Sequence, residues 1–259
     1  MKFLLTVFLL IAGIGAASAD EIAAHWSYDG DDGPPRWAEI SKDYAACKLG
    51  KAQSPIDIVP NMSVSATLPT LEVNWKPFEP EIVSSGFEPK IVDNGHTVQV
   101  NAKGAGVVML DGVSYELLQF HFHHQSEHTI DGKHFPMEVH FVHKSKEGNL
   151  LVIGVFLTEG AENTTKNLII ENMPPKLGSA SLKISINPAD LLPKDKKKFI
   201  RYAGSLTTPP CSEIVLWHVF LDPISTTRAQ IDAFAKLYPN NFRPAQSLNR
   251  RFVLSSGVN

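Results

Sequence analysis

Residues 117–123 read Leu-Leu-Gln-Phe-His-Phe-His, and residues 138–143 read Glu-Val-His-Phe-Val-His. Polar residues alternate with aromatic or β-branched ones in both stretches, which is typical of a strand with one buried face. Alternate residues of a strand share a face, so His121 and His123 lie on the same side of the first strand. If the second strand pairs with the first, His140 joins them. The two stretches therefore predict a sheet on which three imidazoles converge.

The flanking residues indicate what these imidazoles do. Three histidines around an open position are how proteins hold a catalytic zinc ion, whereas a structural zinc usually takes four protein ligands. Gln119 and Glu138 each stand two positions before one of the histidines, on the same face of its strand. An acceptor in that place can orient an imidazole through its second ring nitrogen. We therefore predict one zinc ion per chain. The alternative is a zinc carrier, but a carrier would favour loosely spaced, exposed histidines.

Short apolar runs rich in β-branched and aromatic residues recur along the chain, separated by Pro, Gly, Asn and Asp. Besides the two stretches above, they predict strands at 97–100, 107–110, 151–157, 182–186 and 214–220. One helix is expected between Thr227, which has capping-box spacing with Gln230, and Pro239. The sequence has no internal repeat and no linker, so we expect one β-rich domain over residues 20–259.

Residues 1–19 have the features of a secretory signal peptide. Lys2 gives a positive start, residues 3–16 are apolar, and residues 17–19 fit a signal-peptidase site before Asp20. The apolar run is shorter than the roughly 20 residues of a membrane span, which disfavours the alternative of a retained anchor. We therefore expect a periplasmic or secreted protein whose mature chain, residues 20–259, has no membrane span.

The net charge of the chain limits which classes of partner it can attract. The formal net charge is −3 over 259 residues, which provides no overall field for nucleic acid or anionic lipid. Residues 194–198 form a dense basic run, which we interpret as a solvated turn rather than a binding patch. We expect no nucleic-acid partner.

Cys47 and Cys211 are the two cysteines of the chain. In an oxidising compartment such an isolated, distant pair predicts one long-range disulfide. The alternative is two buried free thiols, which export disfavours.

The residues around the three histidines closely resemble the signature of the α-carbonic anhydrases, and the resemblance covers nearly all of the mature chain. The other matching segments are His25-Trp26-Ser27-Tyr28, Gly-Pro-Pro-Arg-Trp at 33–37, Gln-Ser-Pro-Ile-Asp-Ile at 53–58, Asn94-Gly95-His96, Gly-Ser-Leu-Thr-Thr-Pro-Pro at 204–210, Asn-Phe-Arg-Pro-Ala-Gln at 241–246 and Asn249-Arg250. The resemblance implies a mainly β, single-domain fold: a large, twisted, mostly antiparallel central sheet with short peripheral helices. The implied activity is the zinc-dependent, reversible hydration of carbon dioxide to bicarbonate and a proton.

The resemblance also implies a complete metal site. The implied zinc ligands are His121, His123 and His140. Gln119 and Glu138 would orient the first and the last of them. The main-chain carbonyl of Asn241 would accept the free N–H of His123.

Two further residues would direct the nucleophile. A hydroxyl has one proton to give. In the family the hydroxyl matching Thr207 gives that proton to the carboxylate matching Glu127. Thr207 could then only accept from the zinc-bound hydroxide, whose lone pair would be aimed at carbon dioxide.

The implied apolar substrate pocket consists of Val142, Val152, Leu206, Thr208, Val215 and Trp217.

His96 matches the family's proton shuttle. An imidazole titrates near neutral pH and can pass a proton from the active site to buffer. The resemblance further implies that anions and primary sulfonamides bind at the metal, that Cys47 and Cys211 form the disulfide of exported members, and that the peptides before Pro55 and Pro210 are cis.

One loop departs from the family pattern. Only Gln125 and Ser126 separate His124 from Glu127, whereas vertebrate relatives have a longer loop there. The short loop is similar to that of bacterial members, and this likeness leaves a homodimer open. No zinc ligand is lost, which disfavours the alternative of a catalytically silent binding module.

Overall fold

The computed structural model describes residues 24–80, 90–93, 95–172, 178–180 and 185–257. The predicted signal peptide, residues 1–19, lies outside the described residues, as does most of the strand expected at 182–186. At the end of that expected strand, Ile186 forms an isolated bridge with Phe78.

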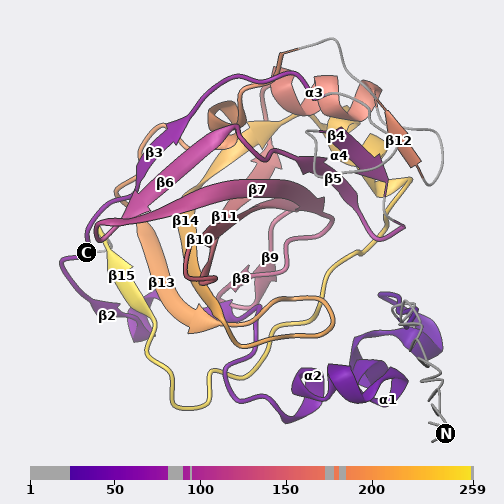
Figure 1. Cartoon of the computed structure of the whole chain (residues 1–259), viewed down its shortest axis with the longest axis vertical. Helices are drawn as coiled ribbons and strands as arrows, with labels where there is room; N and C mark the ends of the chain where they lie inside the picture. The colour runs from indigo at the N-terminus through magenta and orange to yellow at the C-terminus, as the bar shows by residue number, and fades with distance from the viewer. Residues whose placement is uncertain (1–23, 81–89, 94, 173–177, 181–184, 258–259) are drawn as a thin grey trace, which may run out of the picture.

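A large, curved sheet dominates the described part of the chain (Figure 1). Its strands follow the order β12-β4-β5-β7-β10-β11-β14-β13-β15-β2, and β3 is attached through β6 to β7. Most neighbours are antiparallel, but β11 pairs with β14, and β15 with β2, in parallel. The bounds are β2 Val64–Ser65, β3 Glu72–Trp75, β4 Lys90–Asp93, β5 Val98–Asn101, β6 Gly106–Leu110, β7 Val113–His123, β10 Met137–Ser145, β11 Leu150–Glu159, β12 Gly178–Ala180, β13 Phe199–Gly204, β14 Val215–Thr226 and β15 Leu254–Ser256. The prediction of a mainly β fold around one large sheet is confirmed.

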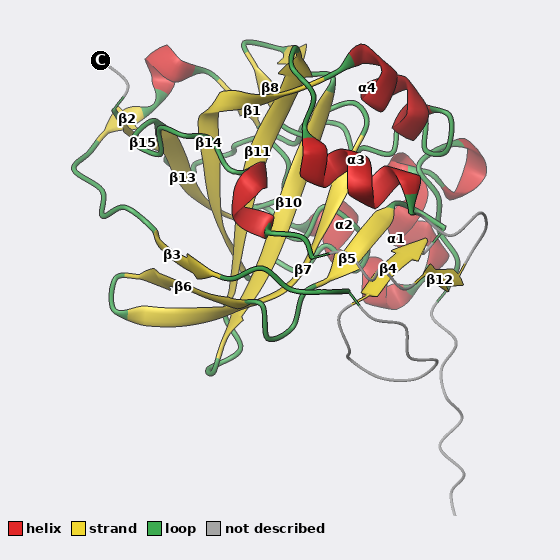
Figure 2. Ribbon diagram, turned by 90° about the horizontal axis from the view of Figure 1, so that it is seen from above, coloured by secondary structure: helices red, strands yellow, loops and turns green. Residues whose placement is uncertain are grey.

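A small second sheet and short helices complete the fold. The small sheet contains β1 (Asp57–Ile58), β8 (Thr129–Ile130) and β9 (Lys133–His134). The helices are η1 Gly30–Asp32, η2 Pro34–Arg36, α1 Trp37–Ile40, η3 Lys42–Tyr44, α2 Ala46–Leu49, η4 Pro60–Met62, α3 Thr164–Glu171, η5 Pro188–Leu191 and α4 Arg228–Ala235. Figure 1 shows α3 and α4 on one side of the curved sheet and α1 and α2 on the other; Figure 2 shows α3 lying across the strands. None of the helices described is long and apolar enough to cross a membrane.

Apolar residues pack on both faces of the sheet. Phe120, Phe122 and Phe141 are buried in one cluster beneath the helices, where Phe122 meets Phe234 of α4 at a ring distance of 6.2 Å. The other face carries a second cluster that includes Val152 and Trp217. The alternation expected from the sequence therefore holds, with histidines on one face and aromatic residues in the core behind them.

Local signals predicted the start of the last helix correctly. Thr227 and Gln230 form the predicted capping box at the start of α4. The helix ends at Ala235, four residues before Pro239, because the following main chain tightens into a turn in which both Leu237 and Tyr238 donate to the carbonyl of Phe234.

The predicted covalent and cis features are present. Cys47 and Cys211 form a disulfide across 164 positions of sequence, which joins α2 to the loop before β14. The Ser54–Pro55 and Pro209–Pro210 peptides are cis, as the family resemblance implied. The His124–Gln125 peptide is also cis, which the sequence did not indicate.

Lys166 of α3 is an unusual member of the interior. Its side chain is fully buried, and its Nζ donates to Oγ1 of Thr226 at 3.1 Å. No carboxylate lies within ion-pair distance of it among the described residues. Burial therefore lowers the pKa of the Lys166 amine to about 7.

Lys166→Met should stabilise the protein near neutral pH. The folded-state pKa of Lys166 lies below its unfolded value of roughly 10.4, so its contribution to stability falls as the pH drops from about 10 to about 7. Methionine removes this dependence, and we expect a gain of about 1–3 kcal/mol at pH 7 that shrinks as the pH rises towards 9.5. Urea unfolding at both pH values checks this, with the exposed Lys146→Met as control. A variant less stable than the parent at pH 7 would contradict the prediction.

Candidate metal centre

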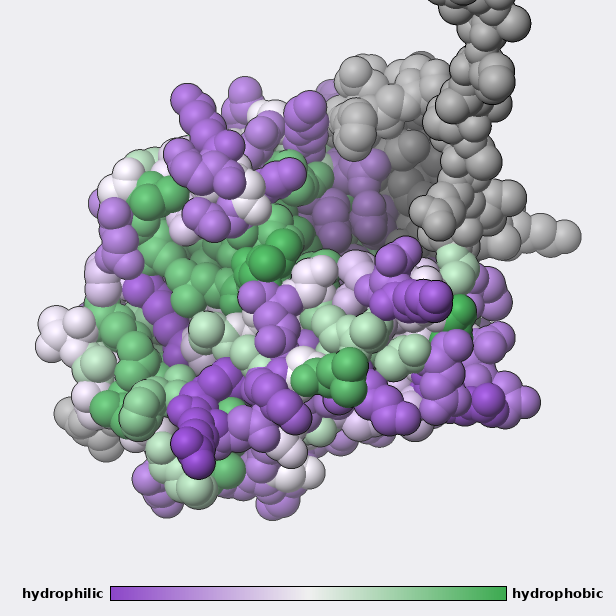
Figure 3. All heavy atoms as spheres, turned by 60° about the horizontal axis from the view of Figure 1, so that its bottom comes forward, coloured by the Kyte–Doolittle hydropathy of each residue, from purple (hydrophilic) through white to green (hydrophobic). Residues whose placement is uncertain are grey.

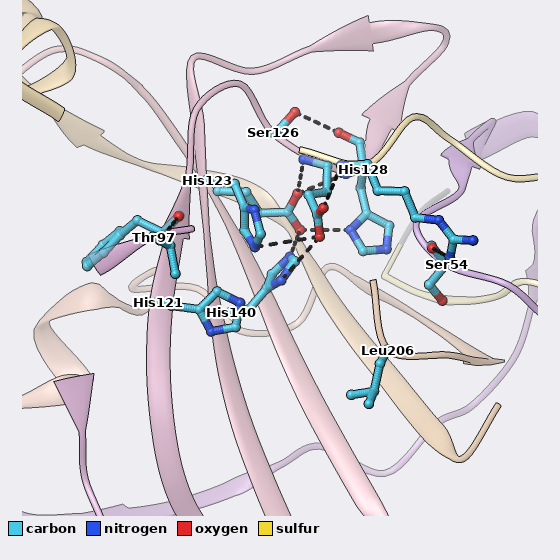
Figure 4. A network of polar contacts seen from close by, with 12 residues as sticks. Ser54, Thr97, His121, His123, Ser126, His128, His140 and Leu206 are labelled. Atoms are coloured by element: carbon cyan, nitrogen blue, oxygen red, sulfur yellow. Dashed lines mark hydrogen bonds and ion pairs between the residues drawn. The ribbon is translucent and has the colours of Figure 1, made fainter. Parts of the chain in front are cut away.

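The register of two strands assembles the histidine cluster. β7 and β10 are antiparallel, with His121 directly opposite His140 and His123 directly opposite Glu138. One ring nitrogen from each of the three histidines lies within 4.8 Å of the other two. Figure 4 shows their rings gathered at one place above the two strands. The predicted convergence of three imidazoles is therefore present.

Each imidazole has a partner on the side that faces away from the cluster. Nδ1 of His121 lies 2.8 Å from Oε1 of Gln119, and Nδ1 of His123 lies 2.7 Å from the main-chain oxygen of Asn241. Nε2 of His140 lies 2.9 Å from Oε1 of Glu138. These contacts leave three ring nitrogens to face one another: Nε2 of His121, Nε2 of His123 and Nδ1 of His140.

The open nitrogens fit a metal ion. Nε2 of His123 is buried and has no hydrogen-bond partner in the part of the chain that the structure describes, a costly state for a polar atom unless something binds it. Burial lowers the pKa of His123, and that of His121 well below its usual value, so both rings are neutral and offer a lone pair. Burial also opposes the charged form of His140, but the adjacent Glu138 carboxylate raises its pKa. A metal ion at Nδ1 of His140 must compete with a proton, so metal affinity should fall in acid.

Glu138 holds the cluster through a network that the sequence did not reveal. Its Oε2 accepts the main-chain N–H groups of Glu127 and His128, both at 2.9 Å, and its Oε1 lies 2.8 Å from Nδ1 of His128. Nε2 of His128 lies 2.7 Å from the Tyr202 hydroxyl, which hydrogen-bonds to Oγ of Ser54 at 3.0 Å. His128 appears in Figure 4 beside the three clustered rings.

This network explains the charge of Glu138. Burial alone would raise the pKa of its carboxyl, but His128 and His140 hold that pKa well below its usual value. A buried carboxylate is therefore available to orient His140. In the sequence, the one hint of His128 was its place in a dense run of histidines, which by itself assigns no role.

Glu127 lies beside the cluster. Its Oε1 accepts the main-chain N–H of Arg243 at 2.8 Å. Its Oε2 is buried and has no hydrogen-bond partner among the described residues, Thr207 included. That oxygen lies 3.6 Å from Nε2 of His123 and 3.7 Å from Nδ1 of His140. Thr207 itself is buried, 6% exposed, in the loop between β13 and β14.

The expected pocket residues form an apolar surface. Val142 lies opposite Val152 on the neighbouring strand, and Val152 lies opposite Trp217 on the next. Val215 and Leu206 pack in the same cluster, while Thr208 is partly exposed nearby in sequence. Because His140 also belongs to this face of β10, the apolar row begins beside the histidines. Figure 3 shows apolar residues gathered in a hollow that hydrophilic residues border.

His96 lies in a neighbouring cleft of about 480 Å³, which Trp26 and Asn241 also line. Its ring stacks on Trp26 with 3.7 Å between centroids, and the ring of His25 lies 6.3 Å away. Burial, and to a lesser degree His25, lowers the pKa of His96. His96 is thus half-buried beside a cleft.

A curved sheet that carries three oriented histidines, two of them buried, defines this protein as one with a candidate three-histidine metal centre. The model of the eukaryotic-type carbonic anhydrase family matches residues 32–257. The chain belongs to this family and is an enzyme of the carbonic anhydrase class, whose general reaction is the hydration of carbon dioxide.

Individual relatives agree. The chain is 41% identical to a carbonic anhydrase of Nostoc sp. over 90% of its own length and 86% of that protein's. It is 38% identical to one of Neisseria gonorrhoeae over 97% and 96% of the two chains. An α-carbonic anhydrase of Thermovibrio ammonificans, solved in complex with the inhibitor sulfanilamide, superposes with a TM-score of 0.82 at 44% identity, over 89% of this chain and 99% of that one.

Gly154→Ala should weaken metal binding. Gly154 lies opposite His140, and a Cβ there would stand 2.8 Å from Oε1 of Glu138 and 3.3 Å from Val219. Glu138 cannot move away without losing its two main-chain donors. We expect zinc affinity to fall about 10–100-fold, as it does when a residue that orients a ligand is lost.

Competition with a chromophoric chelator measures this affinity, with Glu138→Gln as a reference for direct loss of the carboxylate. Circular dichroism checks that each variant is folded. An affinity for zinc equal to that of the parent would show that the clash does not reach the site.

Proposed function

We propose that this enzyme hydrates carbon dioxide with one zinc ion held by His121, His123 and His140. The observation that carries the proposal is the set of three inward nitrogens, each on a ring whose other nitrogen already has an oxygen partner. Three imidazoles match zinc in a catalytic site, which keeps one position open. Two of the rings are neutral, and the third, His140, can give up its proton to a metal ion. When bound, zinc lowers the pKa of a water ligand to about 7, the value known for carbonic anhydrases themselves, and so supplies a nucleophile at neutral pH.

The residues behind the rings fix the ligand atoms. Gln119 and the main-chain carbonyl of Asn241 accept N–H groups and so select the tautomers of His121 and His123. Glu138 does the same for His140. Pre-set tautomers and ring orientations reduce the reorganisation that metal binding and turnover require.

Thr207 and Glu127 would orient the nucleophile. Oε2 of Glu127 is a buried acceptor without a donor among the described residues, placed beside the metal-facing nitrogens. A Thr207 hydroxyl that donates its one proton there can only accept from the nucleophile, which sets the direction of attack. A carboxylate that accepts the main-chain N–H of Arg243 is already fixed in place for this task.

The apolar row of Val142, Val152 and Trp217 would receive the substrate, with Leu206, Val215 and Thr208 around it. Carbon dioxide is small and has no net dipole, so an apolar surface beside the metal suits it better than a hydrogen-bonding pocket.

His96 would export the proton. Direct loss of a proton from a group of pKa about 7 to water is limited to roughly 10³ s⁻¹, since the diffusional ceiling of about 10¹⁰ M⁻¹s⁻¹ multiplies 10⁻⁷ M. Faster turnover requires a relay. The half-buried imidazole of His96, whose pKa is lowered by burial, releases protons readily at neutral pH.

The location of the enzyme, its inhibitors and its oligomeric state belong to the same proposal. The disulfide between Cys47 and Cys211 supports export to the periplasm or beyond, in agreement with the predicted signal peptide over residues 1–19. We propose that anions and sulfonamides bind at the metal; the sulfanilamide complex of the Thermovibrio ammonificans relative supports this. A homodimer stays a prediction. The strand-held histidines, two of them buried, argue against a zinc carrier, and the retained triad argues against a silent binding module.

Stopped-flow measurement of carbon dioxide hydration by the mature protein tests the proposal. We expect rapid hydration that disappears when zinc is removed with a chelator, returns with one equivalent of zinc, and is inhibited by sulfanilamide. A folded, zinc-loaded sample without activity would overturn the proposed function.

His96→Ala should separate proton export from the chemical step. We expect kcat to fall about 10–100-fold while kcat/KM changes little, because kcat/KM does not include regeneration of the nucleophile. Added imidazole should restore kcat. An unchanged kcat in weak, bulky buffers would show that another group carries the proton.

A further inference from the structure

The side chain of Asn241 joins two parts of the active site. It is 2% exposed, in the segment that follows α4. Its Nδ2 donates to the main-chain oxygen of His96 at 3.0 Å and to that of Phe122 at 3.1 Å. Its Oδ1 accepts the main-chain N–H of His124 at 2.7 Å. The main-chain oxygen of the same residue orients His123. A single residue therefore contacts both the segment that contains His96 and Thr97 (the shuttle segment) and β7, which contains His121 and His123 (the ligand strand).

We propose that the Asn241 side chain is a positioning residue for proton transfer, which holds the main chain of His96 at a fixed place relative to the metal ligands on β7. This role is separate from that of its main-chain carbonyl, which any residue at this position supplies. The inference rests on the proposed function, because it requires His96 to carry the proton.

The chemistry of the amide suits this role. An asparagine amide offers two donors and one carbonyl acceptor, and all of them are used here by main-chain groups from two separate segments. Neither aspartate nor an aliphatic side chain can donate to two carbonyls. In a site this buried, each carbonyl left without a donor carries a desolvation penalty.

A second contact ties the same segments together. The hydroxyl of Thr97, next to His96, also donates to the main-chain oxygen of Phe122. That one carbonyl of the ligand strand therefore receives a hydrogen bond from each side: from Thr97 within the shuttle segment and from Asn241 outside it. The segment that contains His96 is therefore joined to the ligand strand through two hydrogen-bonding side chains, those of Thr97 and Asn241.

The position of His96 matters because proton transfer depends steeply on geometry. On its outer side the ring stacks on Trp26, and its main-chain oxygen is held by Asn241. Without the hydrogen bond from Asn241, the ring can still stack on Trp26, but the main chain of His96 loses a contact to the residue that orients His123. A misplacement of about 1 Å can cost up to roughly 10²-fold in rate.

Asn241→Leu removes both donors and the acceptor at similar volume and retains the main-chain carbonyl. We expect kcat to fall about tenfold, kcat/KM to fall much less, and imidazole to restore kcat. The double variant with His96→Ala should lose no more kcat than His96→Ala alone, because both changes disable one step. Asn240→Gly is the matched control: residue 240 is exposed, its φ is 56°, and its side chain makes none of these contacts.

The outcomes are distinguishable. If His96→Ala lowers kcat with rescue by imidazole but Asn241→Leu does not, the positioning role is wrong and the proposed function stands. If Asn241→Leu lowers kcat and kcat/KM equally without rescue, its role is merely structural, and the inference is also overturned. If His96→Ala has no effect, the shuttle itself fails. Should Asn241→Leu not bind zinc, Thr97→Val tests the same hold from the other side, with the same loss and rescue of kcat expected.

Discussion

β7 and β10 pair so that His121 faces His140 and His123 faces Glu138, and every other feature of the site depends on this register. Side chains alternate between the two faces of a strand, so a slip by one residue would turn one strand's polar residues into the core. Phe120 and Phe141, which are also directly opposite and buried beneath α3 and α4, make such a slip costly. The aromatic core thus holds the histidines in place.

The second requirement is a buried negative charge. Glu138 is fully buried, and an isolated carboxylate in that place would be strongly unfavourable. Two main-chain donors and the rings of His128 and His140 compensate for its burial. Tyr202 and Ser54 extend the network to β13 and to the segment before β1. The network orients one metal ligand and, at the same time, connects distant parts of the chain.

The sequence predicted what local patterns encode. Alternation gave β7 and β10 and the shared face of the three histidines, and capping-box spacing gave the start of α4 at Thr227. The strand β13 was missed because Arg201 interrupts its apolar pattern; in the fold this arginine is buried and donates to Nδ1 of His218. Asp222 and Pro223 predicted that the strand ends at residue 220, but β14 continues through Pro223 to Thr226, near the shift in register against β11.

Local sequence patterns could not predict contacts between residues far apart in the chain. Nothing near His128 in the sequence points to Tyr202, and nothing near Gly154 shows that a Cβ there would meet Glu138. The carbonyl of Asn241 was expected only from the family resemblance, and the contacts of its side chain with the His96 segment emerged only from the fold. Such contacts depend on how strands far apart in sequence pack, which periodicity does not specify.

X-ray absorption at the zinc edge of the mature, zinc-loaded protein, with metal stoichiometry measured on the same sample, tests the central claim most directly. The account predicts one zinc ion per chain in a four-coordinate site with three imidazole nitrogens at about 2.0–2.1 Å. Fewer than three imidazoles, a carboxylate such as that of Glu127 in place of one, or several weakly bound ions per chain would contradict it.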